Sequence, residues 1–183
     1  MSKQPETRAN PLIGVVLGSD SDLPVLAPGL EMLETWEVPF EVQILSAHRT
    51  PEAVAKYAQS AGERGLQVII AAAGMAAHLP GVLASYTALP VIGVPIAGNH
   101  LGGVDALYAM VQMPPGIPVA SVGINAAKNA ILLALEVLAL VNPLYRDKLR
   151  AFRKEQAEGV LNKNARMQEL GFRGYSVART EDA

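Results

Sequence analysis

The segment FEVQILSAHRTPEAVAKYAQSAGER, residues 40–64, contains one complete strand–turn–helix unit. We predict a short apolar strand over Phe40–Leu45 and a helix over Pro51–Arg64. Thr50 suits the N-cap of that helix, and Pro51 suits its first turn, where the missing N–H of proline has no bond to lose. The segment therefore predicts a strand that leads into a helix through a single polar turn.

The same alternation continues along the chain in both directions. The predicted strands are apolar and β-branched throughout, which is typical of parallel strands buried on both faces. This pattern predicts one α/β domain, a three-layer doubly wound fold around a parallel sheet. The other strands are expected at Leu12–Leu17, Gln67–Ala71, Val91–Val94 and Val119–Val122, and the other helices at Leu23–Trp36, Ala76–Thr87, Val104–Val111 and Asn125–Val141.

The two ends of the chain differ from this pattern. Residues 1–10 are polar and are expected to be disordered, and residues 11–159 are expected to form the single α/β domain together with its C-terminal helix. Pro143 is predicted to end the fifth helix, and a charged helix from Leu144 to about Gly159 is too polar to lie in the core. Residues 160–183 show no clear apolar face and are predicted to form an irregular tail.

Composition excludes several classes of function. Half of the 183 residues are hydrophobic, 17% are charged and the net charge is -2, with no basic run that would indicate nucleic acid. The absence of cysteine excludes disulfides, zinc–thiolate sites and a cysteine nucleophile. The polar N-terminus argues against a signal peptide, and AILLALEVLALV, which contains Glu136, is shorter than the roughly 18 residues of a membrane span. These features predict a cytoplasmic protein without a membrane or nucleic-acid partner.

Polar and small residues collect directly after the predicted strands. Because ligands of an open parallel sheet bind at the carboxyl ends of its strands, these loops are the candidate site. All three histidines of the chain lie in them. The loops read GSDSD (18–22), SAHRT (46–50), AAGMAAHLPG (72–81) and PIAGNHLGG (95–103).

The loop GSDSD has two interpretations. Ser19 could donate to an anion near a helix N-terminus, or Ser19 and the acidic residues could simply cap that helix. The loop is neither a Walker loop nor GxGxxG, so ATP and dinucleotides are unsupported. A metal held by Asp20 and Asp22 is disfavoured because no histidine ligand is near in sequence.

The loop SAHRT carries the strongest chemical signal. Arg49 is a forked donor suited to phosphate, Ser46 adds a second donor, and His48 can both give and take a proton near neutral pH. Alternatively, Arg49 pairs with a carboxylate and His48 is a surface residue. His78 could merely start a helix, and His100 could merely be solvated.

Together the loops offer anion donors, a carboxylate for hydroxyl groups, one acid/base and a small-residue surface for a flat ring. That combination fits a phosphorylated ribose carrying a heterocycle, and proton transfer to and from that ring. GSDSD, SAHRTPE, AAHLPG and VDALYAMVQMPPGIPVA, in this order, resemble the class I family of 5-(carboxyamino)imidazole ribonucleotide mutase in purine biosynthesis. The resemblance covers about Leu12 to Gln156.

The resemblance implies a flavodoxin-like fold, a homo-octamer, a C-terminal helix that packs on a neighbouring subunit, and no metal or cofactor. It implies that Ser19, Ser46 and Arg49 hold the phosphate and that Asp22 holds the ribose hydroxyls. It implies that His48 is the general acid/base. The residues implied to line the base and the carboxylate belong to the loop Ala72–His78 and the start of the next helix: Ala73, Gly74, Met75, Ala76, His78 and Leu79.

Two residues of this loop depart from the family pattern, which usually has glycine in place of Ala72 and Met75. Because a positive φ is unfavourable for methionine, we predict that Met75 has an ordinary negative φ and turns its side chain away from the ring. Two other functions remain as alternatives, a direct aminoimidazole ribonucleotide carboxylase that uses CO₂ and a non-catalytic phosphosugar-binding module.

Overall fold

The computed structural model describes residues 10–181, with side chains up to residue 176. Its five strands form one parallel sheet in the order β2-β1-β3-β4-β5. This is the flavodoxin-like order, and the chain reverses direction across the sheet between β1 and β3. The strands are β1 (Ile13–Leu17), β2 (Phe40–Ile44), β3 (Val68–Gly74), β4 (Val91–Ile96) and β5 (Ala120–Ser121).

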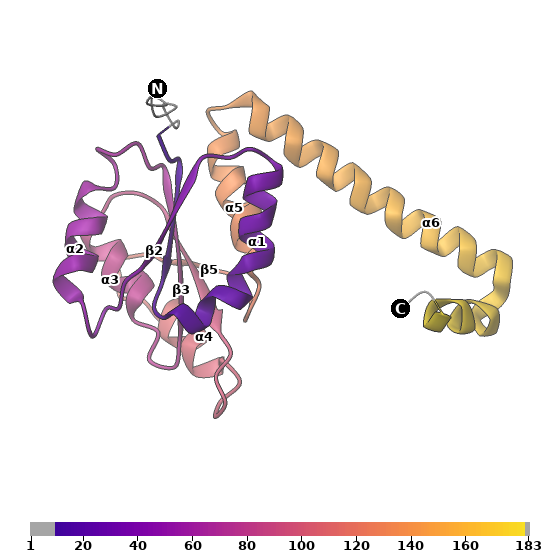
Figure 1. Cartoon of the computed structure of the whole chain (residues 1–183), viewed down its shortest axis with the longest axis horizontal. Helices are drawn as coiled ribbons and strands as arrows, with labels where there is room; N and C mark the ends of the chain where they lie inside the picture. The colour runs from indigo at the N-terminus through magenta and orange to yellow at the C-terminus, as the bar shows by residue number, and fades with distance from the viewer. Residues whose placement is uncertain (1–9, 182–183) are drawn as a thin grey trace, which may run out of the picture.

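Helices cover both faces of the sheet, as predicted (Figure 1). α1 (Leu23–Thr35) and α5 (Ala127–Ala139) lie on one face, and α2 (Pro51–Ser60) and α3 (Leu79–Tyr86) lie on the other. α4 (Val104–Val111) shares the core of the second face, and a single 3-10 turn, η1 (Asp20–Asp22), precedes α1. The three-layer doubly wound prediction is confirmed.

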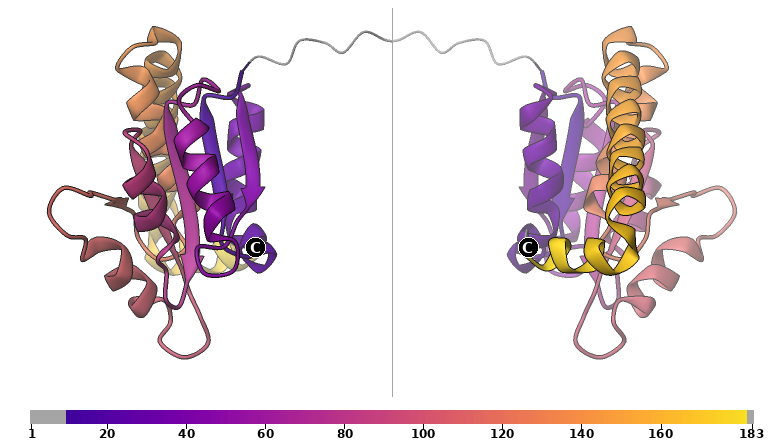
Figure 2. Two further views of the ribbon diagram at one scale, coloured as in Figure 1. Left: turned by 90° about the vertical axis from the view of Figure 1, so that its left-hand side faces the viewer. Right: turned by 90° about the vertical axis from the view of Figure 1, so that its right-hand side faces the viewer.

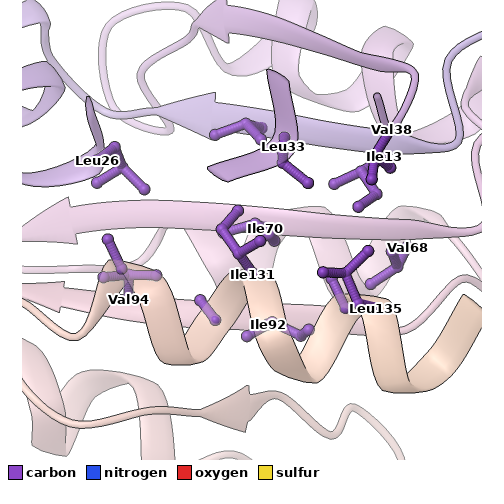
Figure 3. Close-up of a cluster of buried hydrophobic side chains, with 14 of the residues drawn as sticks. Ile13, Leu26, Leu33, Val38, Val68, Ile70, Ile92, Val94, Ile131 and Leu135 are labelled. Carbon is purple, nitrogen blue, oxygen red and sulfur yellow. The ribbon is translucent and has the colours of Figure 1, made fainter. Parts of the chain in front are cut away.

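The burial of the inner strands explains why these strands could be predicted from the sequence. All residues of β1 and β4 and the first six of β3 are buried, which uniform apolar runs require. Figure 3 shows the larger core cluster, in which Leu26 and Leu33 of α1 and Ile131 of α5 pack against the strands. β2, at the edge of the sheet, is only partly buried.

α5 ends at Ala139, and the predicted charged helix after it is confirmed as α6 (Pro143–Glu181), although it is not too polar for the core along its whole length. Its first turns belong to the domain, because Tyr145 and Leu149 are 4% and 6% exposed within the core cluster. The ring of Phe152 lies edge-on to Trp36, with 5.7 Å between ring centroids. The rest of α6 extends away from the domain (Figure 1), and in the right-hand view of Figure 2 it stands in front of the domain.

The prediction of an irregular tail after residue 159 was wrong. The chain is helical up to Glu181, with one non-helical residue, Gly171. The helix propagates from docked first turns, so it does not need an apolar face of its own. Of the segment predicted to be disordered, residues 1–9 lie outside the described residues.

Local boundaries also moved. β5 contains only two of the four predicted residues, and α3 begins at Leu79 instead of Ala76. Thr50 occupies the N-cap position of α2 and Pro51 its first turn, but the Thr50 hydroxyl bonds to the Ser46 backbone and caps nothing. Among the described residues, no helix is both long enough and apolar enough to cross a membrane.

Candidate active site

A cleft of about 470 Å³ opens at the carboxyl ends of β1, β2 and β3, beside the point where the chain reverses across the sheet. Open α/β sheets bind ligands at this place. Three loops far apart in the sequence supply its walls: Gly18, Ser19, Ser21, Asp22, Ser46, Ala47, His48, Arg49, Ala73, Gly74, Met75, Ala76 and Leu79.

The loop after β1 combines a helix cap with a donor-rich surface. The Ser19 hydroxyl accepts from the Ser21 N–H at 3.3 Å, and the Asp22 carboxylate accepts from the Ser19 N–H at 3.1 Å. Ser19 therefore caps the 3-10 turn η1, whereas Asp22, at the N-cap position of α1, makes no side-chain cap hydrogen bond to that helix. Because Ser19 also lines the cleft, this cap leaves open the interpretation that Ser19 donates to a bound anion.

Asp22 is the one buried charged residue of the described chain, at 6% exposure. Burial raises its pKa above the ordinary value for aspartate, and hydrogen bonds from Ser19, Ser21 and Gly18 oppose that rise. A carboxylate that lines a cleft and has unused acceptor positions on its oxygens is suited to accept hydrogen bonds from hydroxyl groups.

The loop after β2 forms a compact donor group. The Arg49 Nη2 donates to the Gly18 carbonyl at 3.1 Å, which ties this loop to the end of β1. The Arg49 Nε and the Arg49 backbone N–H both donate to the Ser46 hydroxyl, at 3.3 Å and 3.2 Å. No ion pair joins Arg49 to a carboxylate in the described part of the chain, so its remaining N–H donors face the cleft without a counter-charge.

His48 is paired with the second candidate histidine. Its Nε2 lies 2.8 Å from Nδ1 of His78, and the two rings meet edge-on. One of these nitrogens must donate and the other accept, so the tautomer of one ring determines that of the other. His78 also stands at the N-cap position of α3, which confirms that it starts a helix.

The loop after β3 brings the backbone close to the cleft. A Cβ on Gly74 would lie 3.3 Å from the Ile96 carbonyl, so only glycine fits there without displacing β4. Met75 has φ of 52°, and the Ala77 and His78 N–H groups close two tight turns onto Met75 and Ala76, both at 2.8 Å. The predicted negative φ was wrong, and the side chain, which was expected to turn away from the ring into subunit packing, lines the cleft.

The structure thus gathers the predicted residues, with one difference. Ten of them line the cleft, whereas His78 lies behind His48 and reaches the cleft only through that contact. Gly18, Ser21 and Ala47 also line it; they stand inside the quoted loops but had been given no role. His100 lies in the exposed loop after β4, outside the cleft. Among residues 10–181 no cluster of three or more acidic residues and histidines could hold a metal ion.

These features define a flavodoxin-like α/β protein with an anion-donor group and a histidine pair in one cleft. The model of the AIR carboxylase family matches residues 12–159, so the chain belongs to that family. A relative from Synechocystis, named N5-carboxyaminoimidazole ribonucleotide mutase, is 53% identical over 92% of this chain and 96% of its own. The Saccharomyces cerevisiae phosphoribosylaminoimidazole carboxylase is 49% identical over 93% of this chain but 30% of its own.

A solved structure agrees with the fold. PurE from Treponema denticola superimposes with a TM-score of 0.78 at 26% identity, covering 86% of this chain and 98% of that one.

Proposed function

We propose that this chain is an isomerase of purine biosynthesis that converts 5-(carboxyamino)imidazole ribonucleotide into 5-amino-4-imidazolecarboxylate ribonucleotide. The carboxylate moves from the exocyclic nitrogen to a ring carbon. One observation carries the proposal: His48, paired with His78 at 2.8 Å, stands beside the Ser46–Arg49 donor group in the same cleft. The relatives named as mutases match almost the whole chain.

The cleft supports one orientation of the substrate. Ser19, Ser46 and Arg49 would hold the phosphate, because they offer hydroxyl and guanidinium donors without a counter-charge. Asp22 would accept hydrogen bonds from the ribose hydroxyls. The small-residue surface of Ala73, Gly74 and Ala76, with Leu79, would then face the flat ring.

In this orientation a single side chain serves both halves of the reaction. His48 protonates the carbamate nitrogen and the C–N bond breaks. The electron pair of that bond stays on nitrogen, and CO₂ is released into the cleft. The electron-rich ring carbon attacks the same CO₂, a C–C bond forms, and His48 removes the ring proton. The proton that His48 gives is returned, so the sequence of steps balances without ATP or another cofactor.

His78 would position His48 in this scheme. Its Nδ1 contact would hold the imidazole of His48 in one orientation beside the cleft. Phosphate binding alone would not require either ring, which argues against a non-catalytic phosphosugar-binding module.

The direct carboxylase alternative shares the second half of the mechanism. An ultraviolet assay of the purified protein with each ribonucleotide, with and without bicarbonate, separates the possibilities. A mutase converts the carbamate at a rate independent of bicarbonate. A carboxylase needs aminoimidazole ribonucleotide and bicarbonate, and binding without conversion of either would indicate a binding module.

We also propose that the chain is cytoplasmic and forms a homo-oligomer, an octamer by family resemblance, with α6 packed on a neighbouring subunit. α4 supports assembly, because Val104, Tyr108 and Val111 are 44%, 60% and 47% exposed on one helix. An exposed apolar face of this kind is typical of an interface. We propose no membrane or nucleic-acid partner.

A further inference from the structure

Met75 combines a disfavoured backbone with an exposed apolar side chain. Three non-glycine residues of the described chain have positive φ, Glu37, Met75 and Asn125, and of these only Met75 lines the cleft. Its side chain is 66% exposed, so it contributes little to the core. Strained residues of this kind persist where they serve the site, so Met75 requires a functional explanation.

The Met75 side chain spans two loops. It starts in the loop after β3, and its Cγ lies 3.8 Å from the position that a Cβ on Gly98 would occupy. Gly98 belongs to the loop after β4, and no residue of that loop lines the cleft. The Met75 side chain therefore lies at the rim of the cleft, between the loop after β3 and the loop after β4.

We propose that the Met75 side chain acts as a gate at the rim of the cleft. It retains CO₂ in the cleft between the two halves of the reaction. The inference rests on the proposed mutase function. After the C–N bond breaks, CO₂ is small and uncharged, so no anion donor of the cleft holds it. Only apolar contact and closure of the rim prevent its escape and replacement by water.

Methionine is suited to this role. Its three rotatable bonds let it pack over a bound ring, and its sulfur makes favourable contacts with aromatic systems. The apolar contact of one methylene corresponds to about fourfold in a partition ratio, and leucine can supply such contact as methionine does, so losing the side chain should change CO₂ retention measurably. Glycine, which the family usually has at this position, would leave the retention of CO₂ to the other walls of the cleft, so Met75 adds to that retention.

The backbone and the side chain of Met75 have separable roles. The positive φ permits the two tight turns that lead to His78 and so places His78 against His48. Met75→Gly keeps access to positive φ and removes both strain and side chain. Met75→Ala keeps the strain and removes the side chain. Met75→Leu keeps an apolar side chain of similar size.

The test is a single turnover with enzyme in excess, starting from the carbamate labelled with ¹³C in its carboxylate, in buffer with unlabelled bicarbonate. Mass spectrometry gives the fraction of label in the C-carboxylated product, and the rate without enzyme is subtracted. We expect wild type and Met75→Leu to retain the label. Met75→Ala and Met75→Gly lose this apolar contact and should both release about three- to tenfold more labelled CO₂ and free aminoimidazole ribonucleotide per turnover.

Controls separate gating from structural damage. Met167→Ala, on α6 and outside the cleft, should retain label as wild type does. The Tm of Met75→Gly should not fall, because strain is relieved. Equal retention by all variants, or a defect in Met75→Gly alone, would overturn the gate and leave the mutase function standing. A wild type that does not interconvert the two carboxylated ribonucleotides would instead overturn the function.

Discussion

The Gly14→Ala substitution tests how tightly the sheet that positions the cleft is packed. Gly14 lies in β1, four residues before the cleft begins at Gly18. A Cβ built on Gly14 would approach the Tyr57 hydroxyl oxygen more closely than the 3.0 Å that real Cβ contacts keep, and would lie 3.1 Å from Cδ1 of Leu66. Tyr57 is held in place by α2 and by Arg64, whose Cζ is 4.6 Å from the ring centroid.

The expected size follows from two opposing contributions. Overpacking of a core costs roughly 1–3 kcal/mol, and replacing glycine by alanine in a strand recovers about 0.5–1 kcal/mol. Gly14→Ala should therefore lower the free energy of unfolding by about 1–2 kcal/mol. At roughly 2–4 °C per kcal/mol for a domain of this size, the Tm should fall by several degrees.

Tyr57→Phe supplies the matched rescue. The Tyr57 hydroxyl is buried without a hydrogen-bond partner in the described structure, and burial and the nearby Glu41 raise its pKa. Its removal alone should be nearly neutral. In the double variant the new Cβ would be 3.4 Å from the ring Cζ, an ordinary contact, so stability should recover by about 1 kcal/mol.

Denaturant unfolding at one fixed protomer concentration measures all four proteins, because assembly makes stability depend on concentration. The reasoning is refuted if the double variant is no more stable than Gly14→Ala alone. That outcome would mean that the Tyr57 hydroxyl is not what limits space at β1.

Three further predictions address the site and the assembly. His48→Asn should lower kcat by about 10²–10⁴-fold, the usual worth of general acid–base catalysis, while calorimetric binding of the ribonucleotide persists; turnover within tenfold of wild type would contradict the mechanism. Asp22→Asn should weaken ribonucleotide binding by about tenfold or more yet stabilise the protein near neutral pH. Because burial raises the pKa of Asp22, the wild type loses stability as the pH rises through that pKa. The difference in unfolding free energy between Asp22→Asn and wild type should therefore vanish in acid below pH 3.8. An equal difference at all pH values would exclude the buried charge as its cause. Deleting residues 160–183 should lower the oligomer mass seen by light scattering while the domain stays folded, and an unchanged mass would show that distal α6 does not hold the assembly together.

The parts of the fold that were predictable are those decided by local pattern. β1, β3 and β4 are apolar throughout because both faces are covered, and that condition is visible in the sequence itself. β5 was overestimated because an edge strand is paired on one side only, and its length depends on β4. The beginning of α3 was missed because two tight turns at Met75 and Ala76 replace its first turn.

The loops that form the site could be predicted from the sequence, but the contacts between their side chains could not. The sheet order brings the ends of β1, β2 and β3 together, so Ser19, His48 and Gly74 were expected near one another. The contact between His48 and His78 joins residues thirty apart in the sequence, and no local signal predicts a ring orientation. Met75 was wrongly placed because strain was assumed to be avoided, whereas the tight turns toward His78 impose it.

The docked beginning of α6 has a consequence for the thermodynamics of association. Starting a helix is unfavourable and extending one is not, so Tyr145 and Leu149, fixed against the domain, act as a nucleus for everything that follows. A free peptide of residues 160–176 should show little helicity by circular dichroism, although the same residues are helical in the chain. The projecting segment therefore meets any partner already ordered. The conformational entropy that a flexible tail would lose on binding is lost during folding instead, and association can be tight with modest contact area.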